Sequence, residues 1–157
     1  MGYRMLIIDD EMSPEKGYGS IEEWFPRVFE IDEARFFVSG NPATASALSR
    51  LTTDRYDVIL VDYCLVEEGL DGPELVAVIR GGLKGFTSEA VAGGLNRNAY
   101  IIGVSTGWVP QAIRLLERLI KRQGLTRGLD GATAEDGSIP LQLRKELQKF
   151  LVSREQD

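Results

Sequence analysis

The chain of 157 residues contains no histidine and a single cysteine. The absence of histidine excludes Ser-His and Cys-His nucleophile chemistry, histidine general bases and histidine metal ligands. Any bound metal must therefore be held by oxygen, which favours Mg²⁺, Mn²⁺ or Ca²⁺. The lone cysteine, Cys64, excludes an internal disulfide and is typical of a reducing, cytoplasmic setting.

The chain also lacks a block rich in Lys and Arg, and it lacks an apolar run long enough to span a membrane. Its formal net charge is -6, so we do not expect nucleic-acid binding to be its main purpose. No signal peptide is expected, because Tyr3-Arg4 leads straight into a short apolar run. The length suits one domain, and the hydrophobic fraction of 43% is typical of a globular protein.

Three short apolar runs each end in polar residues. Residues 5–8 precede Asp9-Asp10-Glu11, residues 57–61 precede Asp62, and residues 100–104 precede Ser105-Thr106. In a parallel α/β sheet the carboxyl ends of the strands converge on one crevice, so these polar groups would meet there. Carboxylates this close repel one another unless protons or a cation intervene. The sequence therefore predicts a divalent metal beside a reactive aspartate.

Strand and helix patterns alternate along the chain. Strands are predicted over residues 4–9, 34–38, 57–63, 99–105 and 132–135. Helices are predicted to begin at the capping box Ser20-Ile21-Glu22-Glu23 and after the cap Asn41-Pro42, and to cover residues 73–80, 110–122 and 140–151. Right-handed crossovers then place helices on both faces of one parallel sheet. A glycine-rich insertion, about 81–98, separates the third helix from the fourth strand.

These three strand ends resemble those of the response-regulator receiver domain of two-component signalling. The residues that carry the resemblance are Leu6-Ile7-Ile8-Asp9-Asp10-Glu11, Asp57-Val58-Ile59-Leu60-Val61-Asp62 and Ile101-Ile102-Gly103-Val104-Ser105-Thr106. The resemblance covers essentially the whole chain, as a single domain over residues 1–157. It implies a flavodoxin-like, doubly wound, five-stranded parallel sheet with the strand order 2-1-3-4-5.

The resemblance also implies a role for each strand-end residue. Asp62 would accept a phosphoryl group. Ser105 would supply the hydroxyl that contacts this phosphoryl group, and Thr106 would be the family's small residue at the next position. Mg²⁺, or Mn²⁺, would be held by Asp9, Asp10, Asp62 and the backbone carbonyl of Cys64. The phosphoryl donor would be a histidine kinase or a histidine phosphotransfer protein. Since no output domain fits in 157 residues, output would occur in trans through a downstream protein.

The sequence departs from the family near its end. The family's lysine, which reaches the phosphoryl group, is replaced by Ser138 or Ile139 before Pro140, and the aromatic switch residue is missing. A pseudo-receiver, an interaction module that phosphorylation does not switch, is therefore the alternative. A third possibility is an aspartate-nucleophile phosphohydrolase, which usually needs a second carboxylate where Cys64 stands. As a receiver, the chain would be a signalling domain with no catalytic turnover beyond its own phosphorylation and dephosphorylation.

Overall fold

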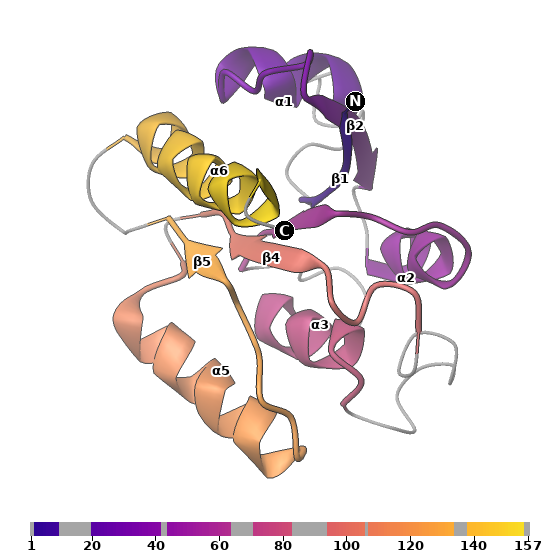
Figure 1. Cartoon of the computed structure of the whole chain (residues 1–157). Coiled ribbons are helices and arrows are strands. Elements are labelled where there is room, and N and C mark those ends of the chain that lie inside the picture. Colours follow the sequence, from indigo (N-terminus) through magenta and orange to yellow (C-terminus); the bar gives the residue numbers. More distant parts are fainter. Residues whose placement is uncertain are drawn as a thin grey trace.

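The sheet is parallel and has five strands in the order β2-β1-β3-β4-β5 (Figure 1). The computed structural model describes residues 2–9, 20–41, 44–63, 71–82, 94–105, 107–133 and 138–155. The strands are β1 (Tyr3–Ile8), β2 (Phe36–Asn41), β3 (Val58–Val61), β4 (Tyr100–Gly103) and β5 (Gly131–Ala132). This strand order confirms the predicted flavodoxin-like, doubly wound architecture.

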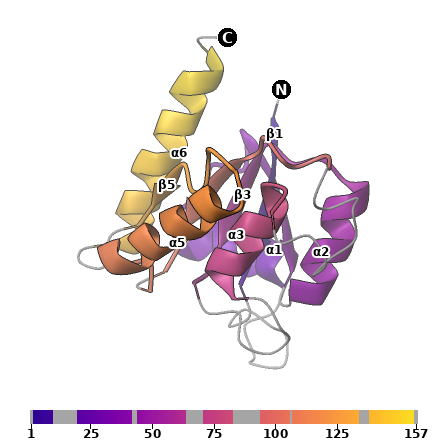
Figure 2. The same ribbon diagram turned by 90° about the horizontal axis from the view of Figure 1, so that it is seen from below.

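Helices cover both faces of the sheet, as predicted. The described helices are α1 (Ile21–Val28), α2 (Thr44–Thr53), α3 (Gly72–Ile79), α5 (Pro110–Arg122) and α6 (Ile139–Glu155). In Figure 1, α1 and α6 lie above the sheet, α3 and α5 lie below it and α2 lies to the right; Figure 2 shows α2, α3 and α5 from their own side. Within the described ranges, no helix has the length and apolarity needed to cross a bilayer.

The central strand β3 is buried on both faces, which explains its uninterrupted apolar run. Side chains alternate between the faces of a strand, and the two halves of the core follow that alternation. Ile59 and Val61 pack with α2, α3 and α5, whereas Val58 and Leu60 pack with α1 and α6. The sheet therefore holds the residues that follow its strands on a rigid, fully packed base.

The prediction for the second strand was wrong at both ends. A turn at Asp32 delays the strand, because the Asp32 carboxylate accepts from the amide of Ala34 at 3.0 Å and the Asp32 carbonyl accepts from Phe36 at 3.0 Å. The strand then continues to Asn41, which pairs with Ile8 of β1. Asn41, which the sequence places just before a helix, is therefore the last residue of β2.

The first helix begins where the sequence predicts, but without the capping box. Ser20 occupies the cap position and makes no side-chain cap hydrogen bond. The carboxylate of Glu22 accepts from the amide of Gly40 at 2.8 Å, and so joins α1 to β2. Pro26 lies inside this eight-residue helix, where it has no backbone N–H to donate.

Arg80, the residue after α3, organises the amino-terminal edge of the sheet. Its side chain is only 2% exposed, and its guanidinium donates to the carbonyls of Gly128, Arg97 and Ala99 and to Oδ2 of Asp130 at 2.9 Å. Burial lowers the pKa of Arg80 to about 10, a shift that the Asp130 carboxylate opposes, so the guanidinium is charged at neutral pH.

Asn96 is a second buried polar side chain at the same edge. Its amide oxygen accepts from the backbone of Tyr56 at 2.7 Å, and its amide nitrogen donates to the carbonyls of Leu51 and Asp54. Arg80 and Asn96 lie on either side of residues 83–93, which include most of the predicted insertion and lie outside the described part of the chain. The flanks of that segment are therefore fixed at the edge opposite Asp62.

Candidate functional site

The carboxyl ends of four neighbouring strands form one row. Ile8 pairs with Val61, Val61 with Gly103, and Gly103 with Ala132. The next residue on each strand continues this register, so the row that follows consists of Asp9, Asp62, Val104 and Thr133. Neighbours in such a row are separated by about 4.8 Å, the spacing between paired strands. The structure thus brings Asp9 beside Asp62, as the sequence predicts.

Asp62 stands at the centre of this row and is mostly buried, with 8% of its surface exposed. Its backbone amide donates to the carbonyl of Ile8 at 3.0 Å, which continues the pairing of β3 with β1 beyond the last strand residue. Gly72, at the start of α3, packs against the backbone of Asp62 and Tyr63. A Cβ on Gly72 would lie 2.3 Å from the Asp62 carbonyl oxygen. The backbone of Asp62 is therefore fixed from two sides.

Ser105 lies one residue beyond the row, and its hydroxyl remains able to donate. The Ser105 Oγ accepts from the amide of Gly107 at 3.1 Å. A serine hydroxyl has one proton and two lone pairs, so this bond uses an acceptor position and leaves the proton for another oxygen. An anion bound near Asp62 could receive that proton in a hydrogen bond.

Thr133 was not predicted as a site residue, yet it anchors Ser105. Its fully buried hydroxyl accepts from the Ser105 amide and donates to the Ser105 carbonyl, both at 3.2 Å. These two bonds join the ends of β4 and β5. A strand of two residues, Gly131–Ala132, has too little periodicity for the sequence to place Thr133 at this point.

Trp108 encloses the backbone on both sides of Asp62. Its indole Nε1 donates to the carbonyl of Val61 at 2.9 Å, and its ring meets the ring of Tyr63 edge-on, with centroids 5.2 Å apart. The side chain is only 1% exposed, so Trp108 belongs to the core. A shift of the backbone around Asp62 would therefore change the contacts that Trp108 makes with Val61 and Tyr63.

The described residues are a partial fit to a divalent cation. The Asp9 and Asp62 carboxylates are hard oxygen ligands of the kind that Mg²⁺ takes, while Asp10, Cys64 and Thr106 lie outside the described residues. Among the residues that are described, no group of three or more His, Cys, Asp or Glu side chains could hold a metal ion. The complete ligand set is therefore still a prediction.

The predicted replacement for the family's lysine was misplaced. Ser138 and Ile139 lie at the start of α6 and not at the end of β5. The residue that follows β5 beside Ser105 is Thr133, whose hydroxyl is neutral and already bonded to the Ser105 backbone. The segment from Gly131 to Pro140 contains no lysine or arginine. Whichever of its residues takes the place of the family's lysine, that residue is therefore not a cation.

One carboxyl group near this edge has a shifted pKa. Glu74 lies in the first turn of α3, where Asp71 caps the helix by accepting from the Glu74 amide at 3.2 Å. Burial raises the pKa of the Glu74 carboxyl, and the neighbouring Asp71 carboxylate raises it further. Asp71 therefore adds negative charge at the helix end that packs against Asp62.

Replacing Thr133 with valine is expected to lower the free energy of unfolding by about 1–3 kcal/mol. Valine keeps the shape but leaves the partly buried amide and carbonyl of Ser105 without these partners. Urea unfolding followed by circular dichroism measures the loss, with Thr133→Ser as the matched control that keeps the hydroxyl. Equal stability of the valine and wild-type chains would show that these bonds contribute nothing.

Comparison with known proteins supports the fold. No protein-family model matches the sequence, and no curated protein matches it. Solved structures do match over nearly the whole chain. The receiver domain of a Francisella response regulator has a TM-score of 0.62 and 18% identity, covering 97% of this chain and 99% of that one. A CheY-like response-regulator receiver protein from Methanospirillum hungatei JF-1 has a TM-score of 0.62 and 15% identity, with complete coverage of both chains.

A third similar structure contains a metal ion. It is the receiver domain of a sensor histidine kinase from Pseudomonas aeruginosa PAO1, with a magnesium ion coordinated in its active-site cleft. Its TM-score is 0.57 and its identity 20%, covering 96% of this chain and 98% of that one. At these identities the comparisons show the fold alone: the chain has the fold of response-regulator receiver domains.

Proposed function

We propose that this chain is a receiver that accepts a phosphoryl group on Asp62 with the help of Mg²⁺ or Mn²⁺. The single observation that supports this most is the strand-end row, which places Asp9 beside a mostly buried Asp62 and brings Ser105 close to the same edge. Asp9, Asp10 and Asp62, with the backbone carbonyl of Cys64, would hold the metal ion.

The proposed reaction is a transfer to a carboxylate. An Asp62 oxygen forms a bond to phosphorus while the bond from phosphorus to the donor's leaving atom breaks, which yields an acyl phosphate. The bound cation would supply charge neutralisation for the carboxylates and the phosphoryl oxygens. The Ser105 hydroxyl would donate a hydrogen bond to one phosphoryl oxygen. The two hydrogen bonds with Thr133 would keep Ser105 in position.

The proposed partners follow from the receiver fold. The donor is a histidine kinase or a histidine phosphotransfer protein in the cytoplasm, and the output is contact with a downstream protein in trans. One of the similar structures is a receiver domain from a sensor histidine kinase, which supports a kinase as the donor. A nucleic-acid or membrane target is not part of this proposal.

The second candidate is a pseudo-receiver, and Thr133 is the observation that favours it. In the receiver family a strand-end lysine contacts the phosphoryl group. In this chain the described residue that follows β5 is a neutral threonine, which is already bonded to Ser105. In that case the fold would present a binding surface, and modification of Asp62 would change nothing that a partner recognises.

The experiment that tests the proposal is incubation of the intact chain with Mg²⁺ and acetyl phosphate, followed by intact-mass measurement. We expect one added phosphoryl group that requires Mg²⁺, survives acid and is lost in base. The matched control is Asp62→Asn, which is expected to remain unmodified. If the wild-type chain gains no phosphoryl group under any condition, the pseudo-receiver replaces the receiver.

Phosphorylation is also expected to change the fluorescence of Trp108, because that side chain contacts the residues on both sides of Asp62. The chain has two tryptophans, so Trp24→Phe isolates the signal of Trp108. Adding acetyl phosphate in the presence of Mg²⁺ should produce a saturable change in emission. The double variant that also carries Asp62→Asn should show no such change; a full response in that variant would mean that the signal arises elsewhere.

A further inference from the structure

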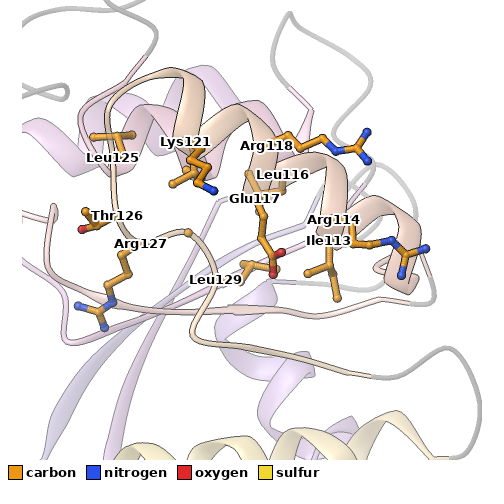
Figure 3. A pocket seen from close by; sticks show the side chains of 12 residues that line it. Ile113, Arg114, Leu116, Glu117, Arg118, Lys121, Leu125, Thr126, Arg127 and Leu129 are labelled. Carbon is orange, nitrogen blue, oxygen red and sulfur yellow. The ribbon is translucent and has the colours of Figure 1, made fainter.

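A small cavity of about 180 Å³ lies at the amino-terminal edge of the sheet, opposite the edge that carries Asp62. Three segments form its walls: Arg80 after α3, residues 97–98 before β4, and residues 124–127 between α5 and β5. The last of these segments also borders a larger groove along α5, which Figure 3 shows; there the Arg127 side chain points away from α5. The cavity is therefore a separate feature of the sheet edge.

Arginine dominates the lining of this cavity. Arg80, Arg97 and Arg127 line it, and none of the described lining residues is acidic. The one described carboxylate bonded to these arginines is that of Asp130, whose Oδ1 lies 2.7 Å from Nε of Arg127 and whose Oδ2 lies 2.9 Å from Nη2 of Arg80. Oδ2 also accepts from the amide of Ile101 at 2.8 Å. Three positive charges therefore share one carboxylate, in a chain whose net charge is -6.

Arg80 supplies charge to the cavity but no free donor. Its guanidinium donates five hydrogen bonds, to three carbonyls and to the Asp130 carboxylate, and a guanidinium has five N–H groups. The side chain is almost fully buried, so water and salt screen its charge poorly. Arg80 would therefore attract an anion in the cavity without bonding to it.

The free donors of the cavity come from Arg97, Thr126 and Arg127. Arg97 is exposed, and its guanidinium forms no hydrogen bond or ion pair within the described ranges. The hydroxyl and the backbone amide of Thr126 likewise have no partner among the described residues. Arg127 uses Nε for Asp130 and Nη1 for the carbonyl of Asn98, which leaves Nη2. These donors stand on two walls of one cavity.

The end of α5 positions part of this donor set. Gly124 has a φ of +74°, and the amides of Gly124 and Leu125 donate to the carbonyls of Lys121 and Ile120, each at 3.0 Å. This is the Schellman arrangement that ends many helices at a glycine. Carbonyls at a helix end carry partial negative charge, which opposes a bound anion. Here these two carbonyls already have donors, and Arg80 binds three further carbonyls at the same edge.

The lining and the volume limit the class of ligand. Leu125 is the one apolar side chain among the described lining residues, and none of them is aromatic. The cavity therefore lacks the surface that an apolar ligand or a stacked base requires. A water molecule occupies about 30 Å³ in the liquid, so there is room for roughly six waters, enough for a phosphoryl group or a diphosphate. Guanidinium groups bind phosphate oxygens with two parallel hydrogen bonds.

We propose that this cavity binds a small phosphorylated molecule through its phosphoryl group. Arg97 and Arg127 would hold the phosphoryl oxygens, Thr126 would donate to them, and the buried charge of Arg80 would add to the attraction. The bound anion would join the end of α3, the start of β4 and the turn after α5, and would thereby stabilise the folded chain. Binding requires neither Mg²⁺ nor modification of Asp62, so it stands or fails independently of the proposed phosphorylation.

The test titrates the intact chain with inorganic phosphate, diphosphate and glucose 6-phosphate in the presence of EDTA, which removes metal from the Asp62 edge. Isothermal titration calorimetry measures each Kd, and amide NMR spectra locate the site. We expect one saturable site with a Kd that rises with salt, and shifts at residues 97–98 and 124–127. The probe that binds most tightly identifies the source of the phosphoryl group. Binding of none of the three, or shifts confined to the strand ends around Asp62, would overturn the proposal.

The variant Arg97→Glu is expected to raise the Kd by about tenfold or more, because it removes a donor and adds negative charge to the cavity. Arg97→Gln, which removes the charge without reversing it, should raise the Kd as well. The matched control is Arg55→Glu, the same change at an exposed arginine that precedes β3 at the same edge but does not line the cavity. It should leave the Kd unchanged. Equal increases for Arg97→Glu and Arg55→Glu would overturn the proposal, since net charge alone would then explain binding.

Discussion

Replacing Arg80 with methionine is expected to lower the free energy of unfolding by about 3–5 kcal/mol, the usual cost of removing one partner from a buried ion pair. The Arg80 guanidinium is bonded to three backbone carbonyls and to the Asp130 carboxylate, whose side chain is 13% exposed. Methionine fills much of the space but leaves these acceptors without their donor. Urea unfolding measures the change.

The control for this prediction is another arginine in an ion pair, Arg144, which pairs with Glu30 on the surface. Both of these side chains are more than half exposed, so Arg144→Met should change the free energy of unfolding by less than about 1 kcal/mol. If the Arg80 and Arg144 variants are equally stable, the network around Arg80 does not hold the edge of the sheet together as described.

The second large effect is expected from Asp9. Replacing Asp9 with asparagine removes one of the two carboxylates that the register places side by side, and with it one of the proposed metal ligands. We expect the rate of Mg²⁺-dependent phosphorylation by acetyl phosphate to fall at least tenfold, since loss of even an indirect metal contact typically costs about 10–100-fold. Intact-mass time courses measure the rate.

The matched control is Asp54→Asn, the same chemical change at the opposite edge of the sheet, before β3. It is expected to leave the rate unchanged. A normal rate in the Asp9 variant, with its dependence on Mg²⁺ intact, would contradict the assignment of Asp9 as a metal ligand.

The sequence predicted the sheet well where hydrophobic burial dominates. The runs at residues 5–8, 58–61 and 100–103 are apolar because those strands are covered on both faces, and such runs are visible without a structure. Among the polar residues predicted to follow these runs, the described ones, Asp9, Asp62 and Ser105, lie at one edge of the sheet. The helix at Pro110–Arg122 was predicted at its observed bounds, because Pro110 marks its first turn.

Predictions failed where a distant or local polar contact decides the structure. The turn at Asp32 shifts the start of β2, and Ser20 makes no side-chain cap bond where the sequence predicts a capping box. Leu115 is apolar but 52% exposed, because it lies beside the buried stripe of Ala112, Leu116 and Ile120. Hydrophobicity alone did not separate Leu115 from its neighbour Leu116.

The part of the site that the sequence missed depends on pairing between strands. Thr133 bonds to Ser105 across 28 positions, and Trp108 bonds to Val61 across 47. No local pattern encodes either contact, since each arises only when β3, β4 and β5 are side by side. The same reason explains Arg80 and Asn96, whose partners lie between 17 and 50 positions away along the chain.

The most direct test of the central claim is to locate the phosphoryl group. After reaction with Mg²⁺ and acetyl phosphate, borohydride reduces an aspartyl phosphate to homoserine, and tryptic cleavage after Arg55 and Arg80 releases residues 56–80 for sequencing by mass spectrometry. The proposal predicts homoserine at position 62 alone, with Asp57 and Asp71 on the same peptide unchanged. Homoserine at either of those positions, or at none, would contradict it.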